Sequence, residues 1–302
     1  MLHLLLAGLC LFILIKSANV FIDQSLAVAK ELKLSGFLIG FTILSLGTAL
    51  PDIIISIFAV TQNNPDFAIS TFLGSAFANM TLLVGVLSFF TKYKLNKTDV
   101  EKNIPITFAA SVGLLILILL FRMKFTWIVG VIVLAIYIIT ILFASQNNNS
   151  KISQKTDKIN IAIFIISFIL LIVAGKICTD QFILFANQYN ISNSLVGYFM
   201  VALGITIPEL VTSLEVIKRG DMDLSLGNIL GATLINILFI PGLASLLTTL
   251  NFRPFIPGVI FLIISILIFY FLSILGKEYY ITKREGFAML LIYILFILFQ
   301  FI

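Results

Sequence analysis

Two short motifs place an acidic residue directly after a proline in the middle of long apolar segments. The first, GTALPD, ends at Asp52, and the second, GITIPE, ends at Glu209. Proline lacks the backbone donor that would pair with the carbonyl four residues earlier, which frees the carbonyls of Gly47 and Gly204. Freed carbonyls and a carboxylate within apolar surroundings need a partner, and a cation can serve both. The motifs therefore predict a cation site built from oxygen atoms.

Two other apolar segments extend this set of oxygen atoms. The segment LGSAFAN ends at Asn79, and LGATLIN ends at Asn236. Residues four apart share one face of a helix, so Ser75 lies on the face of Asn79. The predicted side-chain ligands are Asp52, Glu209, Asn79, Asn236, Thr48, Ser75 and Thr206. Hard cations such as Ca²⁺ prefer oxygen ligands, whereas softer metals prefer the Cys or His side chains that these segments lack.

The composition indicates an integral membrane protein. Hydrophobic residues make up 60% of the 302 residues and charged residues 11%, with a mean hydropathy of +1.15; a soluble domain has about 25% charged residues. Because a helix needs about 20 residues to cross the bilayer, we predict an all-α fold of ten transmembrane helices, in a transporter and not an enzyme. The predicted helices are 2–22, 35–61, 67–91, 104–121, 125–145, 159–182, 194–217, 224–250, 255–276 and 286–302.

The basic residues predict the orientation in the membrane. Most of the 19 Lys and Arg residues fall in the connections that follow odd-numbered helices. The positive-inside rule then places both termini outside a multi-pass protein of the plasma membrane. These residues are scattered over several loops instead of forming one stripe, which argues against binding to nucleic acid.

The chain repeats itself at an offset of 157 residues, as seen for Pro51 and Pro208, Gly74 and Gly231, and Asn79 and Asn236. Five helices in each half force the second half to enter the membrane in the opposite sense, so we predict inverted repeats. Such repeats are typical of secondary transporters, whose sites lie between the repeats. The predicted units are a first repeat (1–145), a cytoplasmic linker (146–158) and a second repeat (159–302).

These motifs resemble the repeats of the sodium/calcium exchangers, within the cation/calcium exchanger superfamily, in a prokaryotic form without a regulatory domain. The resemblance extends over nearly the whole chain. It implies that Asp52 and Glu209 bind Ca²⁺ and Na⁺ in alternation, without a cofactor. It also implies ligation by the backbone carbonyls of Ser45, Ala202 and Ile205. The expected partners are the lipid bilayer and inorganic cations, with no obligatory protein partner.

Departures from the family pattern affect the hydroxyl ligands. The family's hydroxyl positions fall on Ala49, Thr206, Ser75 and Ala232, so two hydroxyls are missing here. We therefore expect unequal Na⁺ sites, or fewer of them than in the family. Potassium-dependent relatives carry an acid where Asn236 stands, which argues against K⁺ cotransport.

The expected function is exchange of Ca²⁺ for Na⁺ by alternating access, with helices 1 and 6 resembling the pair that slides across the core in this family. Two alternatives remain open. Protons can replace Na⁺ as the counter-ion, because two carboxylates bind protons as well as cations. In a second alternative, the chain binds cations without transporting them.

Overall fold

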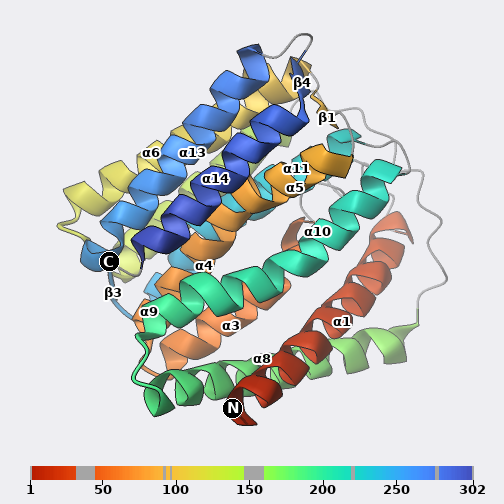
Figure 1. Ribbon diagram of the computed structural model, residues 1–302. Coiled ribbons are helices and arrows are strands. Elements are labelled where there is room, and N and C mark those ends of the chain that lie inside the picture. Colours follow the sequence, from red (N-terminus) through yellow and green to blue (C-terminus); the bar gives the residue numbers. More distant parts are fainter. Residues whose placement is uncertain are drawn as a thin grey trace.

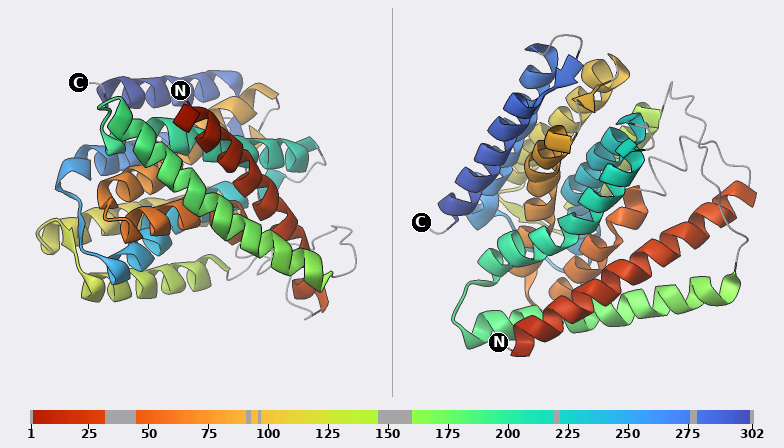
Figure 2. Two further views of the ribbon diagram at one scale, coloured as in Figure 1. Left: turned by 90° about the horizontal axis from the view of Figure 1, so that it is seen from below. Right: turned by 45° about the vertical axis from the view of Figure 1, so that its right-hand side comes forward.

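The computed structural model describes residues 2–31, 45–90, 93–95, 97–145, 160–218, 222–275 and 279–300. The described part is a bundle made mostly of helices (Figure 1). Two long helices, α1 (Leu2–Glu31) and α8 (Ile161–Gln188), lie side by side on the outside of the bundle and pack against each other (Figures 1 and 2). The predicted linker 146–158 lies outside the described residues.

The rest of the bundle is divided between the two halves of the chain. The first half contains α2 (Ser45–Thr48), α3 (Leu50–Thr61), α4 (Pro65–Ala78), η2 (Asn79–Leu83), α5 (Val84–Phe90), β1 (Tyr93–Lys94), η3 (Asp99–Asn103), α6 (Ile104–Leu120), β2 (Lys124–Phe125) and α7 (Trp127–Ser145). The second half contains α9 (Asn193–Leu195), η4 (Val196–Val201), α10 (Ala202–Lys218), α11 (Met222–Leu234), η5 (Ile235–Phe239), α12 (Ile240–Leu247), β3 (Leu250–Asn251), η6 (Arg253–Phe255), α13 (Ile256–Leu275), β4 (Tyr280–Ile281) and α14 (Lys283–Phe299).

Every predicted apolar run contains a described helix, but not every helix is long enough to span a bilayer alone. Within the described residues, seven helical stretches have the length and hydropathy of a membrane span. The other runs contain α3, α14 and the apolar stretch Asn193–Ile207, which are shorter. Residues 35–44 of the second predicted helix fall outside the description. The number of ten spans therefore stays a prediction.

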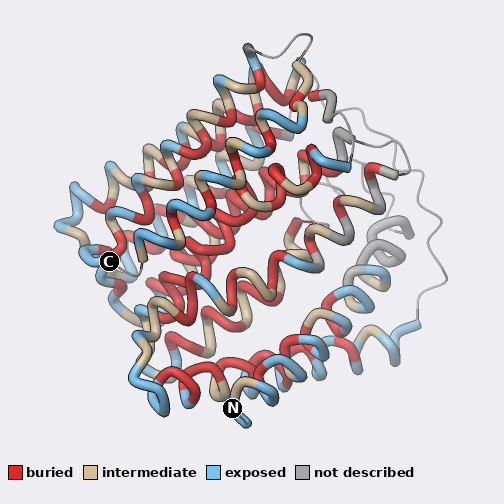
Figure 3. Tube along the Cα trace, viewed as in Figure 1, coloured by how far each residue is buried: buried red, intermediate tan, exposed pale blue. Residues whose placement is uncertain are grey.

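Two helical stretches form the centre of the bundle. In Pro65–Phe90 (α4, η2 and α5) and Ser225–Leu247 (α11, η5 and α12), 83% of the residues in an 18-residue apolar segment are buried, whereas this share is at most 39% in the other five candidate spans. Figure 3 shows buried residues concentrated in the middle of the bundle and exposed residues on its outer helices. Polar side chains on the two central stretches are therefore shielded from the surroundings, which positions them for a buried site.

The two halves interlock through reciprocal contacts. Helix α5 packs against α14, and α7 packs against α12. A Cβ atom on Gly85 would lie 3.0 Å from the Gly286 carbonyl oxygen, and one on Gly242 would lie 3.3 Å from the Gly130 carbonyl oxygen. Two short antiparallel ribbons, β1–β4 and β2–β3, also join the halves. The sequence did not predict these ribbons, because two-residue strands leave no periodic pattern.

The helices are irregular where the motifs occur. In the first half, α2 and α3 are separated at Ala49, and Pro51 lies in the first turn of α3. In the second half, α10 continues through Pro208, so the carbonyl that this proline is expected to free at Gly204 does not interrupt the helix, and a helix break at both motifs is the wrong expectation. One missing backbone hydrogen bond leaves the neighbouring bonds of that helix in place. Two π-helical turns, η2 and η5, contain Asn79 and Asn236; such turns occur frequently at functional sites.

Candidate cation-binding site

The Asp52 carboxylate is held by donors from both halves of the chain. It lies in the first turn of α3 and is fully buried. The Ser75 hydroxyl of α4 donates a 2.6 Å hydrogen bond to Oδ1 of Asp52. The Asn236 amide of η5 donates a 3.3 Å hydrogen bond to Oδ2. The structure therefore brings together three residues that the sequence predicted as ligands.

The Glu209 carboxylate is buried without comparable support. Its exposed fraction is 3%, and its Oε1 atom has no hydrogen-bond partner among the described residues. Asn79 is a near neighbour of Glu209, yet neither polar atom of its amide is in hydrogen-bonding geometry with a described residue. The Oδ1 atom of Asn236 is unpartnered in the same sense. Buried polar groups are normally paired. This cluster of unpaired atoms therefore indicates a place where a cation could be coordinated by oxygen atoms.

The threonine hydroxyls and the backbone carbonyls that were predicted as ligands bond to one another. Thr48 donates to the Ser45 carbonyl at 3.2 Å and to the Asn228 side-chain oxygen at 3.1 Å. Thr206 donates to the Ala202 carbonyl at 2.7 Å. A hydroxyl that donates its proton to a carbonyl still has lone pairs free to face a cation. This arrangement orients the hydroxyl oxygens without using up their capacity as ligands.

Three polar residues near the motifs were missed by the sequence reasoning. Asn228 contacts Thr48 and lies two helical turns before Asn236, so its spacing on α11 was a usable signal. Ser56 and Ser213 each follow a motif acid by one turn and are equivalent at the repeat offset. Both serines are buried, and their hydroxyls have no partner within the described part of the chain.

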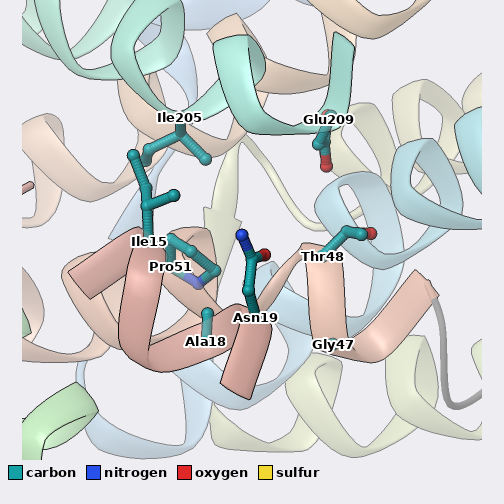
Figure 4. A pocket seen from close by; sticks show the side chains of 8 residues that line it. All are labelled: Ile15, Ala18, Asn19, Gly47, Thr48, Pro51, Ile205 and Glu209. Carbon is teal, nitrogen blue, oxygen red and sulfur yellow. The ribbon is translucent and has the colours of Figure 1, made fainter. Parts of the chain in front are cut away.

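A pocket between α1, the first motif and α10 leads to Glu209. Figure 4 shows the Glu209 carboxyl group pointing into the space beside Asn19 and Thr48. The Ile205 side chain contributes to the wall, so its predicted backbone ligand position adjoins this space. Asp52 does not line the pocket. The residues around the pocket are Ile15, Ala18, Asn19, Gly47, Thr48, Pro51, Ile205 and Glu209.

The charges of the site favour a cation. Neither acid has a Lys or Arg partner among the described residues, and the two carboxylates repel each other. In that part of the chain, no group of three or more His, Cys, Asp or Glu side chains forms a metal cluster. The donors are instead two carboxylates, two amides and several hydroxyls, the oxygen chemistry that suits Ca²⁺ and Na⁺ and not soft metals.

Comparisons with known sequences agree with this chemistry. The profile of the family described as sodium/calcium exchanger protein matches residues 2–146 and 159–302. An uncharacterized membrane protein of Methanocaldococcus jannaschii is 28% identical over 296 residues, which cover 94% of this chain and 93% of the relative. The sodium/calcium exchanger MaX1 of Methanosarcina acetivorans is 23% identical over 350 residues, which cover 99% of this chain and 98% of the relative.

The fold is also similar to a solved exchanger. A structure of the sodium-calcium exchanger NCX_Mj, soaked with 2.5 mM Na⁺ and 0.1 mM Ca²⁺, has a TM-score of 0.70 and 26% identity. The match covers 96% of this chain and 95% of that one. Since the family profile extends over both halves, this chain belongs to the sodium/calcium exchanger family.

Proposed function

We propose that this protein is a secondary-active antiporter that exchanges Ca²⁺ for Na⁺ by alternating access. The observation that carries the proposal is the pair of buried carboxylates, Asp52 and Glu209, which have no basic partner among the described residues and lie close to polar side chains from both halves. Bare charges are costly in an apolar interior. Cations that neutralise them make the buried site stable.

Competition for the carboxylates couples the two ions. Two negative charges are neutralised by one Ca²⁺ or by two or more Na⁺. Binding Ca²⁺ and Na⁺ together would leave an excess of positive charge in the site. The proposed ligands are those expected from the sequence: Asp52, Glu209, Asn79, Asn236, Thr48, Ser75 and Thr206, with the carbonyls of Ser45, Ala202 and Ile205. Each conformational change then carries either Ca²⁺ or Na⁺ across the membrane.

The proposed architecture is ten membrane spans in two inverted repeats, residues 1–145 and 159–302, joined by a cytoplasmic linker. Both termini lie outside the plasma membrane. The reciprocal pairing of α5 with α14 and of α12 with α7 supports a pseudo-twofold relation between the repeats, and an odd number of spans in each repeat would place that axis in the membrane plane. The peripheral pair α1 and α8 is free to slide across the rest of the bundle, since most of its exposed surface is apolar and faces lipid.

The sodium sites are proposed to be unequal. Ser75 provides a hydroxyl to the first motif acid, while its repeat partner Ala232 has none. Thr206 keeps the hydroxyl that its partner Ala49 lacks. We therefore expect one peripheral Na⁺ site to be intact and its counterpart to be weak.

Ion flux through purified protein in liposomes tests the function. We expect an outward Na⁺ gradient to drive ⁴⁵Ca²⁺ uptake, and Asp52→Asn and Glu209→Gln each to abolish it. Glu101→Gln is the matched control, because that carboxylate lies on the surface in an exposed pair with Lys97.

Varying Na⁺, K⁺ and pH separately distinguishes the alternatives. Flux driven by a pH gradient without Na⁺ would establish proton coupling instead. Binding of ⁴⁵Ca²⁺ without any counterflow would establish a non-transporting protein. Normal exchange by both acid variants would contradict the site.

A further inference from the structure

The two motif acids are related by the internal repeat but differ in access. A pocket reaches Glu209, whereas the corresponding region at Asp52 is closed. The open side is the pocket beside Glu209, where α1 faces α10. At the repeat offset, α1 corresponds to α8 and the second part of α10 corresponds to α3. The equivalent of the open pocket is therefore the contact between α8 and α3, which would lead to Asp52.

Helices α8 and α3 are in close contact, as are α1 and α10 beside the pocket, where a Cβ atom on Gly204 would lie 2.3 Å from Cδ2 of Leu11. A Cβ atom on Gly175 would lie only 2.2 Å from Cγ2 of Ile54, so the two helices leave no space there. At the end of the same interface, the Gln62 amide donates a 2.5 Å hydrogen bond to the Asp180 carboxylate. Asp52 is accordingly fully buried, while the pocket reaches Glu209.

The α1 residues that line the open pocket have identifiable counterparts on α8. Ile15 corresponds to an identical residue, Ile172, and Ala18 corresponds to the smaller Gly175. The third changes charge, because Asn19 corresponds to Lys176. Both of these polar side chains are exposed on their helices.

We propose that Lys176 lines the second access route, as Asn19 lines the first, and makes cation binding from that side weaker. This inference rests on the proposed exchange function, because it requires the α8–α3 contact to open when the α1–α10 pocket closes. A lysine ammonium beside the route to Asp52 repels entering cations and favours their release. Asn19 is neutral and does neither. With both termini outside, the Asn19 route faces the cytoplasm and the Lys176 route faces the exterior.

The effect has a signature that depends on ion valence. For a charge on the order of 10 Å from the ion in a water-filled route, Coulomb's law gives about a two-fold change in apparent affinity for Na⁺ and about a four-fold change for Ca²⁺. The Ca²⁺ factor is the square of the Na⁺ factor, because the interaction energy doubles with the charge. A merely structural role of Lys176 has no reason to follow this relation.

Transport assays in right-side-out and inside-out vesicles test the proposal. We expect Lys176→Asn to lower the half-saturating Ca²⁺ concentration about four-fold on one face only. Asn19→Lys should raise it on the opposite face, and Lys176→Arg should match the wild type because it keeps the charge. Equal half-saturating concentrations for wild type and Lys176→Asn on both faces, with normal maximal flux, would overturn the inference and leave the exchange function standing.

Thiol labelling tests the two routes without relying on transport. In a background with Cys10 and Cys178 replaced by serine, a membrane-impermeant, water-requiring thiol reagent should modify Asn19→Cys from one face and Lys176→Cys from the other. Lack of labelling at Lys176→Cys, or labelling of both positions from the same face, would overturn the inference. A wild-type protein without Na⁺-driven Ca²⁺ flux but with labelling from opposite faces would instead remove the proposed coupling and keep the two routes.

Discussion

The two motif acids occupy equivalent positions in the repeat but differ in their surroundings. Asp52 is fully buried and accepts hydrogen bonds from Ser75 and Asn236. Glu209 points into a pocket, and its Oε1 atom has no partner in the described part of the chain. The protein thus holds one carboxylate by hydrogen bonds from both halves, whereas the other faces a pocket.

The repeat explains the difference residue by residue. The donor to Asp52, Ser75, corresponds to Ala232, which is fully buried and has no hydroxyl to offer Glu209. The second donor, Asn236, corresponds to Asn79, which lies near Glu209 without hydrogen-bonding geometry. A lost hydroxyl and a differently oriented amide thus give the two acids different surroundings.

The largest expected effect comes from removing either charge. Asp52→Asn and Glu209→Gln should each weaken Ca²⁺ binding by about 30-fold or more, because truncating one side of a buried charge interaction costs about 2–5 kcal/mol. Isothermal titration with Ca²⁺ measures this loss. If only Glu209→Gln weakens binding, Asp52 is a structural acid and the two halves do not share one site.

A smaller effect should separate the two asparagines. Asn79→Ala and Asn236→Ala should each lower Ca²⁺ affinity about ten-fold through the loss of one oxygen ligand, or about 1.4 kcal/mol. Their stabilities without cations should differ. Asn236→Ala removes a donor to a carboxylate and should lower the free energy of unfolding by about 1.5–3 kcal/mol.

Within the described residues the Asn79 side chain has no hydrogen bond to lose, so Asn79→Ala should leave that free energy unchanged or raise it. Thermal unfolding in detergent with a chelator, compared with unfolding in excess Ca²⁺, separates the two contributions. Equal destabilisation by both variants in the chelator would contradict the contrast between the acids.

The smallest expected effect comes from moving the hydroxyl between the halves. Ala232→Ser should supply Glu209 with the donor that Ser75 gives Asp52, which would raise the free energy of unfolding by about 1 kcal/mol. Ser75→Ala should lower it by a similar amount. Na⁺ titrations of the two variants should shift in opposite directions by a few-fold. Shifts in the same direction would show that Ala232 does not face the ion path.

The proximity of Asp52, Ser75 and Asn236 was predictable from the sequence, whereas their role as cation ligands stays a prediction. Asp52, Ser75 and Asn236 could be brought together in advance, because polar residues in apolar runs must meet and the repeat identifies the runs. The difference between Asp52, which accepts two hydrogen bonds, and Glu209, which points into the pocket, could not be predicted. It depends on the orientations of amide and hydroxyl groups, which are set by packing. The helix break at Ala49 but not at Pro208 likewise depends on tertiary contacts.

The π-helical turns at Asn79 and Asn236 were also beyond sequence reasoning. One residue more in a turn leaves the hydrophobic pattern of the surrounding helix almost unchanged. The side of the molecule that is open was unpredictable for a different reason. The two routes are built from nearly the same residues, so their relative energies depend on small differences in packing between α1, α8 and their neighbours.

The close glycine contacts between α5 and α14 and between α7 and α12 bear on how the chain can be assembled. In each of these contacts a glycine of one half lies against backbone of the other half, so a half synthesised alone would lose this close packing. Two half-chains made separately would have to associate to restore the same glycine contacts. The covalent link between residues 145 and 160 therefore sets a one-to-one ratio of the halves, while the surfaces that recognise each other lie in the helices.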